Sequence, residues 1–136
     1  MSSSDEAPKT ILAVDDEPDV IIGIRAVLEA EGYEVLEAGD GKQALAVLRT
    51  QRPDLVVLDV LMPGMDGWET LSAIQADERL KDIPVLMLTA LGQPQDIGKG
   101  IGLGCTWYCT KPITNYDDFV LVVRRILEGV ESPEQT

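Results

Sequence analysis

The chain has 136 residues, of which 45% are hydrophobic and 26% are charged. This size and composition are typical of one globular domain, and they exclude a chain that is disordered throughout. Its 24 acidic and 11 basic residues give a formal net charge of -13. This charge argues against nucleic acid or an anionic membrane as a direct partner, because both are bound by clustered Lys and Arg. Histidine is absent, which excludes Ser-His-Asp catalysis and His-ligated metal sites.

The first half of the chain alternates short apolar runs with segments of helical periodicity. Residues 10–14 and 34–38 predict strands, the second nearer an edge because it alternates polar and apolar residues. A helix is predicted over residues 20–30, with Pro18 in its first turn. Asp40 is a candidate cap for the next helix. The apolar run 55–58 predicts a central parallel strand that is covered on both faces.

The second half continues the same alternation. Residues 62–67 form a turn-rich segment, followed by a predicted helix at 68–76 and a buried strand at 85–88. The segment 92–104 has helical rhythm but contains four glycines, which weaken a helix. A last strand is predicted at 106–109, and Thr114 or Asn115 is expected to cap a final helix.

This order of elements predicts an α/β fold in which helices cover both faces of a five-stranded parallel sheet. We expect the domain to span residues 10–129. Residues 1–9 are predicted to be a flexible segment, and residues 130–136 a flexible tail or the start of a linker. In such sheets ligands bind beyond the carboxyl ends of the strands, so the residues at those ends are the candidate site.

Polar residues stand at the ends of four predicted strands. Asp15 and Asp16 follow the first strand, Asp59 the third, Thr89 the fourth and Lys111 the fifth. Acids in this position can simply cap the next helix, as Asp16 or Glu17 would, but Asp59 directly follows four apolar residues, where an unpaired charge is unfavourable. Clustered carboxylates suit Mg2+, which prefers oxygen ligands. A carboxylate beside such an ion can act as nucleophile toward a phosphoryl group.

These residues, in this order and spacing, resemble the receiver domain of two-component response regulators. The motifs are the paired acids Asp15 and Asp16, Asp59, the segment 62–67 (MPGMDG), Thr89 with Ala90, and Lys111 with Pro112. The similarity covers about residues 10–129. It implies the flavodoxin-like receiver fold, doubly wound with strand order 2-1-3-4-5.

The resemblance also implies a role for each matching residue. Asp59 would be the phosphoacceptor. Asp16, Asp59 and the backbone carbonyl of Leu61 would bind Mg2+, or Mn2+ in its place, with Asp15 acting through water. The residues expected to bind the phosphoryl group or to switch with it are Thr89, Ala90, Lys111 and Tyr108. The peptide bond before Pro112 would be cis, as X–Pro bonds allow.

The implied function is that of a phospho-accepting response regulator in a phosphorelay. The phosphoryl group would come from a sensor histidine kinase or a histidine phosphotransfer protein, and the signal would pass to an unknown downstream protein or effector domain through the helix 4, strand 5 and helix 5 face. The protein would not be an enzyme, apart from phosphorylating and dephosphorylating its own Asp59. The sequence leaves open a stand-alone protein or a module of a longer regulator. No signal peptide or membrane segment is visible, so we expect a cytoplasmic protein without membrane partners.

Three other classes of protein share part of this pattern. A phosphorylation-independent pseudo-receiver is the main alternative. A haloacid-dehalogenase type of enzyme would need an Asp two residues after the nucleophile, where Leu61 stands. A flavodoxin would need a phosphate-binding loop in place of Asp15, Asp16 and Glu17.

Three further expectations concern individual residues. Leu61 and Leu91 would offer no hydrogen bond to an attacking water, which predicts a long-lived phosphoryl group. Trp107 is either an exposed partner anchor or packs on the last helix. Cys105 and Cys109 are expected to be buried free thiols.

Overall fold

Five parallel strands form one sheet in the order β2-β1-β3-β4-β5. The computed structural model describes residues 8–90, 107–111 and 113–129, without the side chains of residues 89, 90 and 110. The strands are β1 (Thr10–Val14), β2 (Glu34–Ala38), β3 (Leu55–Asp59), β4 (Val85–Ala90) and β5 (Trp107–Lys111). The strand order expected from the resemblance is confirmed, and so is the α/β fold class.

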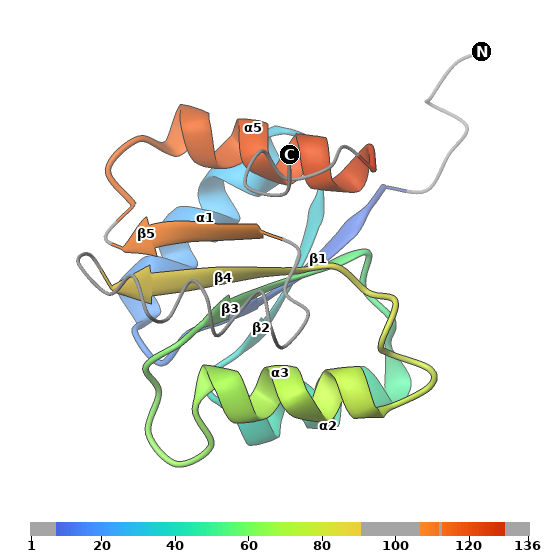
Figure 1. Cartoon of the computed structure of the whole chain (residues 1–136). Coiled ribbons are helices and arrows are strands. Elements are labelled where there is room, and N and C mark those ends of the chain that lie inside the picture. Colours follow the sequence, from blue (N-terminus) through green and yellow to red (C-terminus); the bar gives the residue numbers. More distant parts are fainter. Residues whose placement is uncertain (1–7, 91–106, 112, 130–136) are drawn as a thin grey trace.

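Helices cover both faces of this sheet (Figure 1). They are α1 (Pro18–Ala30), α2 (Gly41–Thr50), α3 (Gly67–Ala76) and α5 (Tyr116–Leu127). The pair α1 and α5 lies on one face, and the pair α2 and α3 lies on the other. The segment predicted to be a helix at 92–104 lies outside the described residues, as do residues 1–7 and 130–136, predicted to be flexible. None of the helices described by the structure has the length and hydropathy to cross a membrane.

The central strands are buried on both faces, as their apolar runs predicted. Side chains alternate along a strand, so Leu12 and Leu58 face the core between the sheet and the α2–α3 pair. Their neighbours Ala13 and Val57 face the second core, toward α1 and α5. Burial of both faces keeps the strands in register and aligns their carboxyl ends at one edge.

The last two strands are longer than predicted. The parallel ladder between β4 and β5 pairs Thr89 with Thr110 and Ala90 with Lys111. Lys111 is therefore the last residue of β5, whereas the sequence placed it after a strand ending at residue 109. This difference matters because backbone pairing with β4 holds the Lys111 Cα in a regular position at the sheet edge.

Trp107 at the start of β5 is buried, with 7% of its surface exposed. It belongs to the same core cluster as Phe119 and Val123 of α5. Its packing on the last helix is thus confirmed, and its alternative role as an exposed anchor is wrong. Cys109, two residues farther along β5 on the same face, is only half-buried and forms no disulfide among the described residues. Cys105 lies outside the described residues.

The helix starts follow local side-chain capping at three of four positions. Asp40 caps α2 by accepting a hydrogen bond from the Gln43 N–H, as predicted, and Asn115 rather than Thr114 caps α5. Asp66 and Glu69 form a capping box that begins α3. Helix α1 differs: Glu17 occupies its N-cap position but makes no side-chain cap hydrogen bond. The interpretation of Glu17 as a capping acid is therefore wrong.

Candidate functional site at the carboxyl edge of the sheet

Three aspartates meet at the carboxyl edge of the central strands. Asp15 and Asp16 follow β1 directly, and Asp59 is the last residue of β3. One carboxylate oxygen from each lies within 4.8 Å of the other two. Asp15 and Asp59 are only 2% and 3% exposed, whereas Asp16 is open to solvent. Buried like charges at this distance repel each other and require a cation to balance them.

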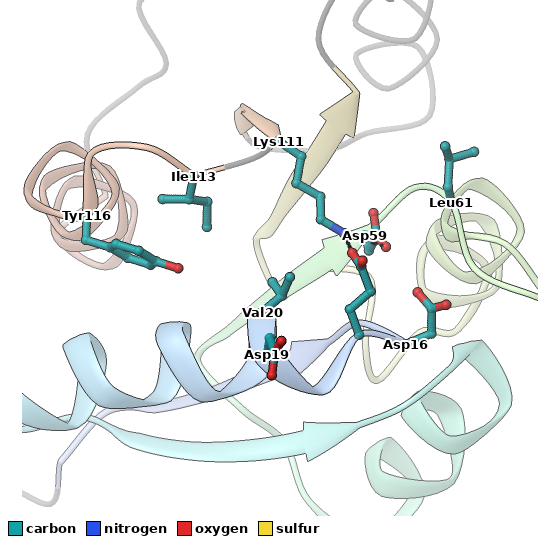
Figure 2. Close-up of a pocket in the computed structure, with 9 residues that line it drawn as sticks. Asp16, Asp19, Val20, Asp59, Leu61, Lys111, Ile113 and Tyr116 are labelled. Atoms are coloured by element: carbon teal, nitrogen blue, oxygen red, sulfur yellow. Dashed lines mark hydrogen bonds and ion pairs between the residues drawn. The ribbon is translucent and has the colours of Figure 1, made fainter.

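Lys111 supplies the nearest positive charge. Its Nζ lies 2.9 Å from Asp15 Oδ2, 2.9 Å from Glu17 Oε1 and 3.1 Å from Asp59 Oδ2. The contacts to Glu17 and Asp59 are hydrogen bonds in which the ammonium donates. Figure 2 shows the Lys111 side chain reaching from the end of β5 toward Asp59 at the end of β3. The ammonium thus bridges three carboxylates from two different parts of the chain.

The electrostatics of the site are dominated by burial. Desolvation, reinforced by the charge of Asp15, raises the pKa of Asp59 to about 6, although the hydrogen bond and charge of Lys111 act to lower it. Burial on its own would lower the pKa of Lys111. Its contacts with the carboxylates of Asp15, Glu17 and Asp59 outweigh burial and raise that pKa above the ordinary value. Lys111 therefore stays charged. Its single positive charge does not offset the burial of Asp59 enough to bring the pKa of that carboxyl back to its ordinary value.

The donor set suits a divalent cation. Asp15 Oδ2 is buried and accepts no hydrogen bond among the described residues, since its approach to Lys111 is an ion pair by distance alone. The other oxygen, Oδ1, accepts a hydrogen bond from the Glu17 N–H at 2.9 Å. Three clustered carboxylates with a spare buried oxygen are hard ligands of the kind that Mg2+ prefers. The residues present therefore fit this ion.

An open cleft of about 640 Å³ leads to the cluster. Its polar part is formed by the charged side chains of Asp16, Glu17, Asp19, Asp59 and Lys111. Its apolar walls come from Val20, Leu61, Ile113 and Tyr116. Ile113 and Tyr116 lie on one side of Lys111 and Leu61 lies on the other (Figure 2). The cleft gives a second molecule access to Asp59 past an apolar rim.

Comparison with known proteins identifies the family of this chain. Residues 11–124 match the family described as the response regulator receiver domain. The chain belongs to this family. A match of this extent runs from β1 to α5 and omits only the first residue of β1 and the last three residues of α5.

Solved receivers have the same architecture. A response regulator from Chloroflexus aurantiacus is 36% identical, with a TM-score of 0.85 over 89% of this chain and 98% of that one. The chemotaxis protein CheY4 of Vibrio cholerae is 34% identical, with a TM-score of 0.83 over 88% of this chain and 99% of that one. The receiver therefore superposes on nearly complete solved chains.

Curated relatives correct one expectation about partners. The receiver is 41% identical to the DNA-binding dual master transcriptional regulator RpaA of Synechocystis, over 89% of this chain and 50% of RpaA. It is 43% identical to the phosphate regulon transcriptional regulatory protein PhoB of Pseudomonas aeruginosa, over 78% of this chain and 46% of PhoB. The chain spans about half the length of these relatives. The exclusion of nucleic acid as a partner is wrong for such regulators, because it rested on the net charge of the receiver alone.

The structure describes only part of the predicted set of site residues. It brings Asp15, Asp16, Asp59 and Lys111 together. Thr89 and Ala90 end the neighbouring strand β4, but their side chains, as well as Pro112 and Leu91, lie outside the described residues. Tyr108 is half-buried against the core on the α2–α3 face and pairs with Met87 across the ladder. Leu61 is 69% exposed, which puts its side chain at the rim of the cleft.

Sequence reasoning missed the contact between Glu17 and Lys111 and the aromatic wall of the cleft. In the sequence Glu17 is only an acid beside Asp16, because its partner Lys111 lies 94 residues away. Tyr116 has no sequence signal beyond its place at the start of the final helix. No local pattern indicates either contact, because both arise from the parallel alignment of β1 and β5 at the same edge.

Proposed function

We propose that this receiver accepts a phosphoryl group on Asp59 from a phosphohistidine of a sensor histidine kinase or histidine phosphotransfer protein. One observation carries the proposal: a buried aspartate at the end of a central strand lies between two further aspartates and a lysine, at the base of an open cleft. Nucleophile, counter-charges and access are thus present in one place.

In the proposed reaction an Asp59 carboxylate oxygen attacks phosphorus in line with the leaving nitrogen. A bond forms between that oxygen and phosphorus, the phosphorus–nitrogen bond breaks, and the imidazole nitrogen keeps its electron pair. With its pKa raised to about 6, Asp59 is mostly ionised at neutral pH and available as nucleophile. Lys111 would donate to a phosphoryl oxygen and stabilise its charge.

The remaining residues are assigned by their positions. Asp16, Asp59 and the Leu61 carbonyl would bind Mg2+ directly, and Asp15 would act through water. When bound, the ion would neutralise the aspartates and withdraw charge from the phosphoryl oxygens. Thr89 and Ala90 at the end of β4 would contact the phosphoryl group, and Tyr108 would respond to it. The peptide bond before Pro112 would be cis, as the resemblance to receiver domains implies.

The output would follow from rearrangement of the face formed by β5, α5 and the segment between β4 and β5. Residues 10–129 are the proposed signalling unit. The descriptions of RpaA and PhoB as transcriptional regulators favour control of transcription as the process served. A pseudo-receiver that works without phosphorylation remains the second candidate, which the following experiment separates from the first.

The test is incubation with phosphoramidate and Mg2+, read by intact mass. The parent chain should gain one phosphoryl group, and Asp59→Asn should abolish the gain. Asp82→Asn, an exposed acid between α3 and β4, is the matched control and should behave as the parent. No gain by the parent in the presence of bound Mg2+ would favour the pseudo-receiver.

A further inference from the structure

The three carboxylate partners of Lys111 differ sharply in exposure. The side chains of Asp15 and Asp59 are 1% and 4% exposed, whereas that of Glu17 is 61% exposed. An ammonium group has three N–H donors, and all three partners lie within 3.1 Å of Nζ. Nζ hydrogen-bonds Glu17 and Asp59 and forms an ion pair with Asp15, so Lys111 can move toward a phosphoryl oxygen only if one carboxylate gives up its contact.

Burial decides which contact is lost most easily. Separating Lys111 from Asp15 or Asp59 would leave a buried carboxylate without its cation, which is strongly unfavourable. Separating it from Glu17 returns an exposed carboxylate to water, at the low free energy that is typical of surface pairs. Glu17 is thus the partner that Lys111 exchanges.

The local structure of Glu17 suits this exchange. Its N–H donates to Asp15 Oδ1 at 2.9 Å, which holds the backbone against the cluster. Its carboxylate occupies the N-cap position of α1 but makes no cap hydrogen bond with the helix. Moving the carboxylate away from Lys111 therefore breaks no cap. The backbone of Glu17 is therefore fixed, while its carboxylate can move away from Lys111 Nζ.

We propose that Glu17 is a positioning residue that holds Lys111 in the resting receiver and releases it to the incoming phosphoryl group. While Glu17 holds one donor of Nζ, the lysine binds Asp15 and Asp59 less strongly, so Glu17 also favours Mg2+ at those carboxylates. The release of Lys111 to a phosphoryl group rests on the proposed phosphoryl transfer. The effect of Glu17 on Mg2+ binding does not depend on it.

The two halves predict opposite effects of Glu17→Gln. Mg2+ should bind about two- to fivefold more weakly, which is the range that an exposed ion pair supports. At saturating Mg2+, phosphorylation by phosphoramidate should be faster by a similar factor, because Lys111 is free to meet the phosphoryl group. Titration calorimetry measures the first effect, and intact mass over time measures the second.

Asp19→Asn is the matched control for charge. Asp19 is an exposed acid that lines the same cleft, and the structure records no ion pair between it and Lys111 among the described contacts. Its loss should change both quantities clearly less than Glu17→Gln does. Equal effects of the two variants would overturn the proposal, because the loss of any one negative charge in the cleft would then explain the changes in Mg2+ binding and in phosphorylation rate.

Two further variants separate contact from charge. Glu17→Asp keeps the charge but shortens the side chain, so it should accelerate phosphorylation as Glu17→Gln does; parent-like rates would contradict the contact. In a Lys111→Met background, Glu17→Gln should weaken Mg2+ binding no more than Asp19→Asn does, since the coupling passes through Lys111. An undiminished effect there would overturn the proposal.

If the parent takes up no phosphoryl group, the proposed function fails, and the Mg2+ titrations still decide the role of Glu17.

Discussion

Lys111 Nζ and Asp59 Oδ2 lie 3.1 Å apart, although 52 residues separate the two in the sequence. The contact is possible because β3 and β5 both end at the same edge of the sheet, on either side of β4. Asp15 approaches the same ammonium from β1. A single lysine therefore ties together three strand ends and is the main internal counter-charge of the site.

Lys111→Met should destabilise the receiver when no divalent cation is present. The change leaves Asp15 and Asp59 buried without their cation, and removal of one partner from a buried pair costs roughly 3 kcal/mol. Urea denaturation in EDTA measures the loss. Lys81→Met, which breaks an exposed pair with Glu78, should cost less than about 1 kcal/mol; a loss of equal size would show that the Lys111 contacts add nothing.

The Asp59 carboxyl group should make stability fall as pH rises. Its pKa is about 6 in the folded chain against an ordinary value of 3.8, so the folded state binds the proton more tightly than the unfolded state. Between these two pH values the free energy of unfolding decreases as pH increases, and above pH 6 the penalty is complete. Two pKa units correspond to roughly 3 kcal/mol.

Asp59→Asn tests this penalty. In EDTA at pH 7.5 the variant should be more stable than the parent by roughly 1–3 kcal/mol. The gain should shrink as pH falls below 6 and disappear below about pH 3, where the parent carboxyl is mostly protonated in both states. Denaturation curves across this pH range measure the difference. Asp82→Asn should leave the pH dependence unchanged. A gain that stays constant with pH would exclude ionisation of Asp59 as its cause.

Mg2+ should stabilise the parent chain by mass action. An ion that binds only the folded state at a hundredfold excess over its Kd adds about 2.7 kcal/mol to the free energy of unfolding. Asp15→Asn should reduce this increment, because it removes the charge of a buried carboxylate whose Oδ2 accepts no hydrogen bond among the described residues. Thermal unfolding with MgCl2, compared with NaCl at equal ionic strength, measures the effect. Equal shifts in the two salts would contradict a specific site.

Gly67→Ala should disturb the segment that follows Asp59. A Cβ at Gly67 would overlap the Asp59 carbonyl oxygen and lie 2.7 Å from Val60 Cα, and backbone atoms cannot move away as a flexible side chain can. We expect a loss of about 1–3 kcal/mol together with weaker Mg2+ binding. At Gly39 the new Cβ would meet only the flexible side chain of Gln43, so Gly39→Ala should have little effect on either quantity.

Leu61→Ala should shorten the lifetime of the proposed phosphoryl group. Leu61 lies at the rim of the cleft and cannot hydrogen-bond a water, so its loss should open a path to Asp59 without adding a catalytic group. Decay of the phosphorylated form, followed by intact mass, measures this. Leu121→Ala is the control, because Leu121 is an exposed leucine of α5 outside this cleft. Unchanged decay in Leu61→Ala would exclude shielding by this side chain.

The first two strands and two helix caps could be predicted from local sequence. Strands β1 and β2 have the predicted bounds, and Asp40 caps α2 as expected. Their signals are local: a run of apolar residues favours burial, and a short polar side chain satisfies a helix N–H. The end of β5 was predicted two residues early, since its last residues pair with β4 through the backbone and carry no apolar signal of their own.

The amino-acid sequence by itself determined the fold class and the identity of the acids and the lysine at the strand ends, because apolar periodicity and residue type are properties of neighbours along the chain. The tertiary structure decided how these groups meet. Only the parallel alignment of β1, β3 and β5 sets the distances from Lys111 to Asp15, Glu17 and Asp59. Burial and the nearby charge of Asp15, which arise only in the folded chain, raise the pKa of Asp59. The same fold leaves Glu17 as the exposed partner of Lys111 that can be exchanged.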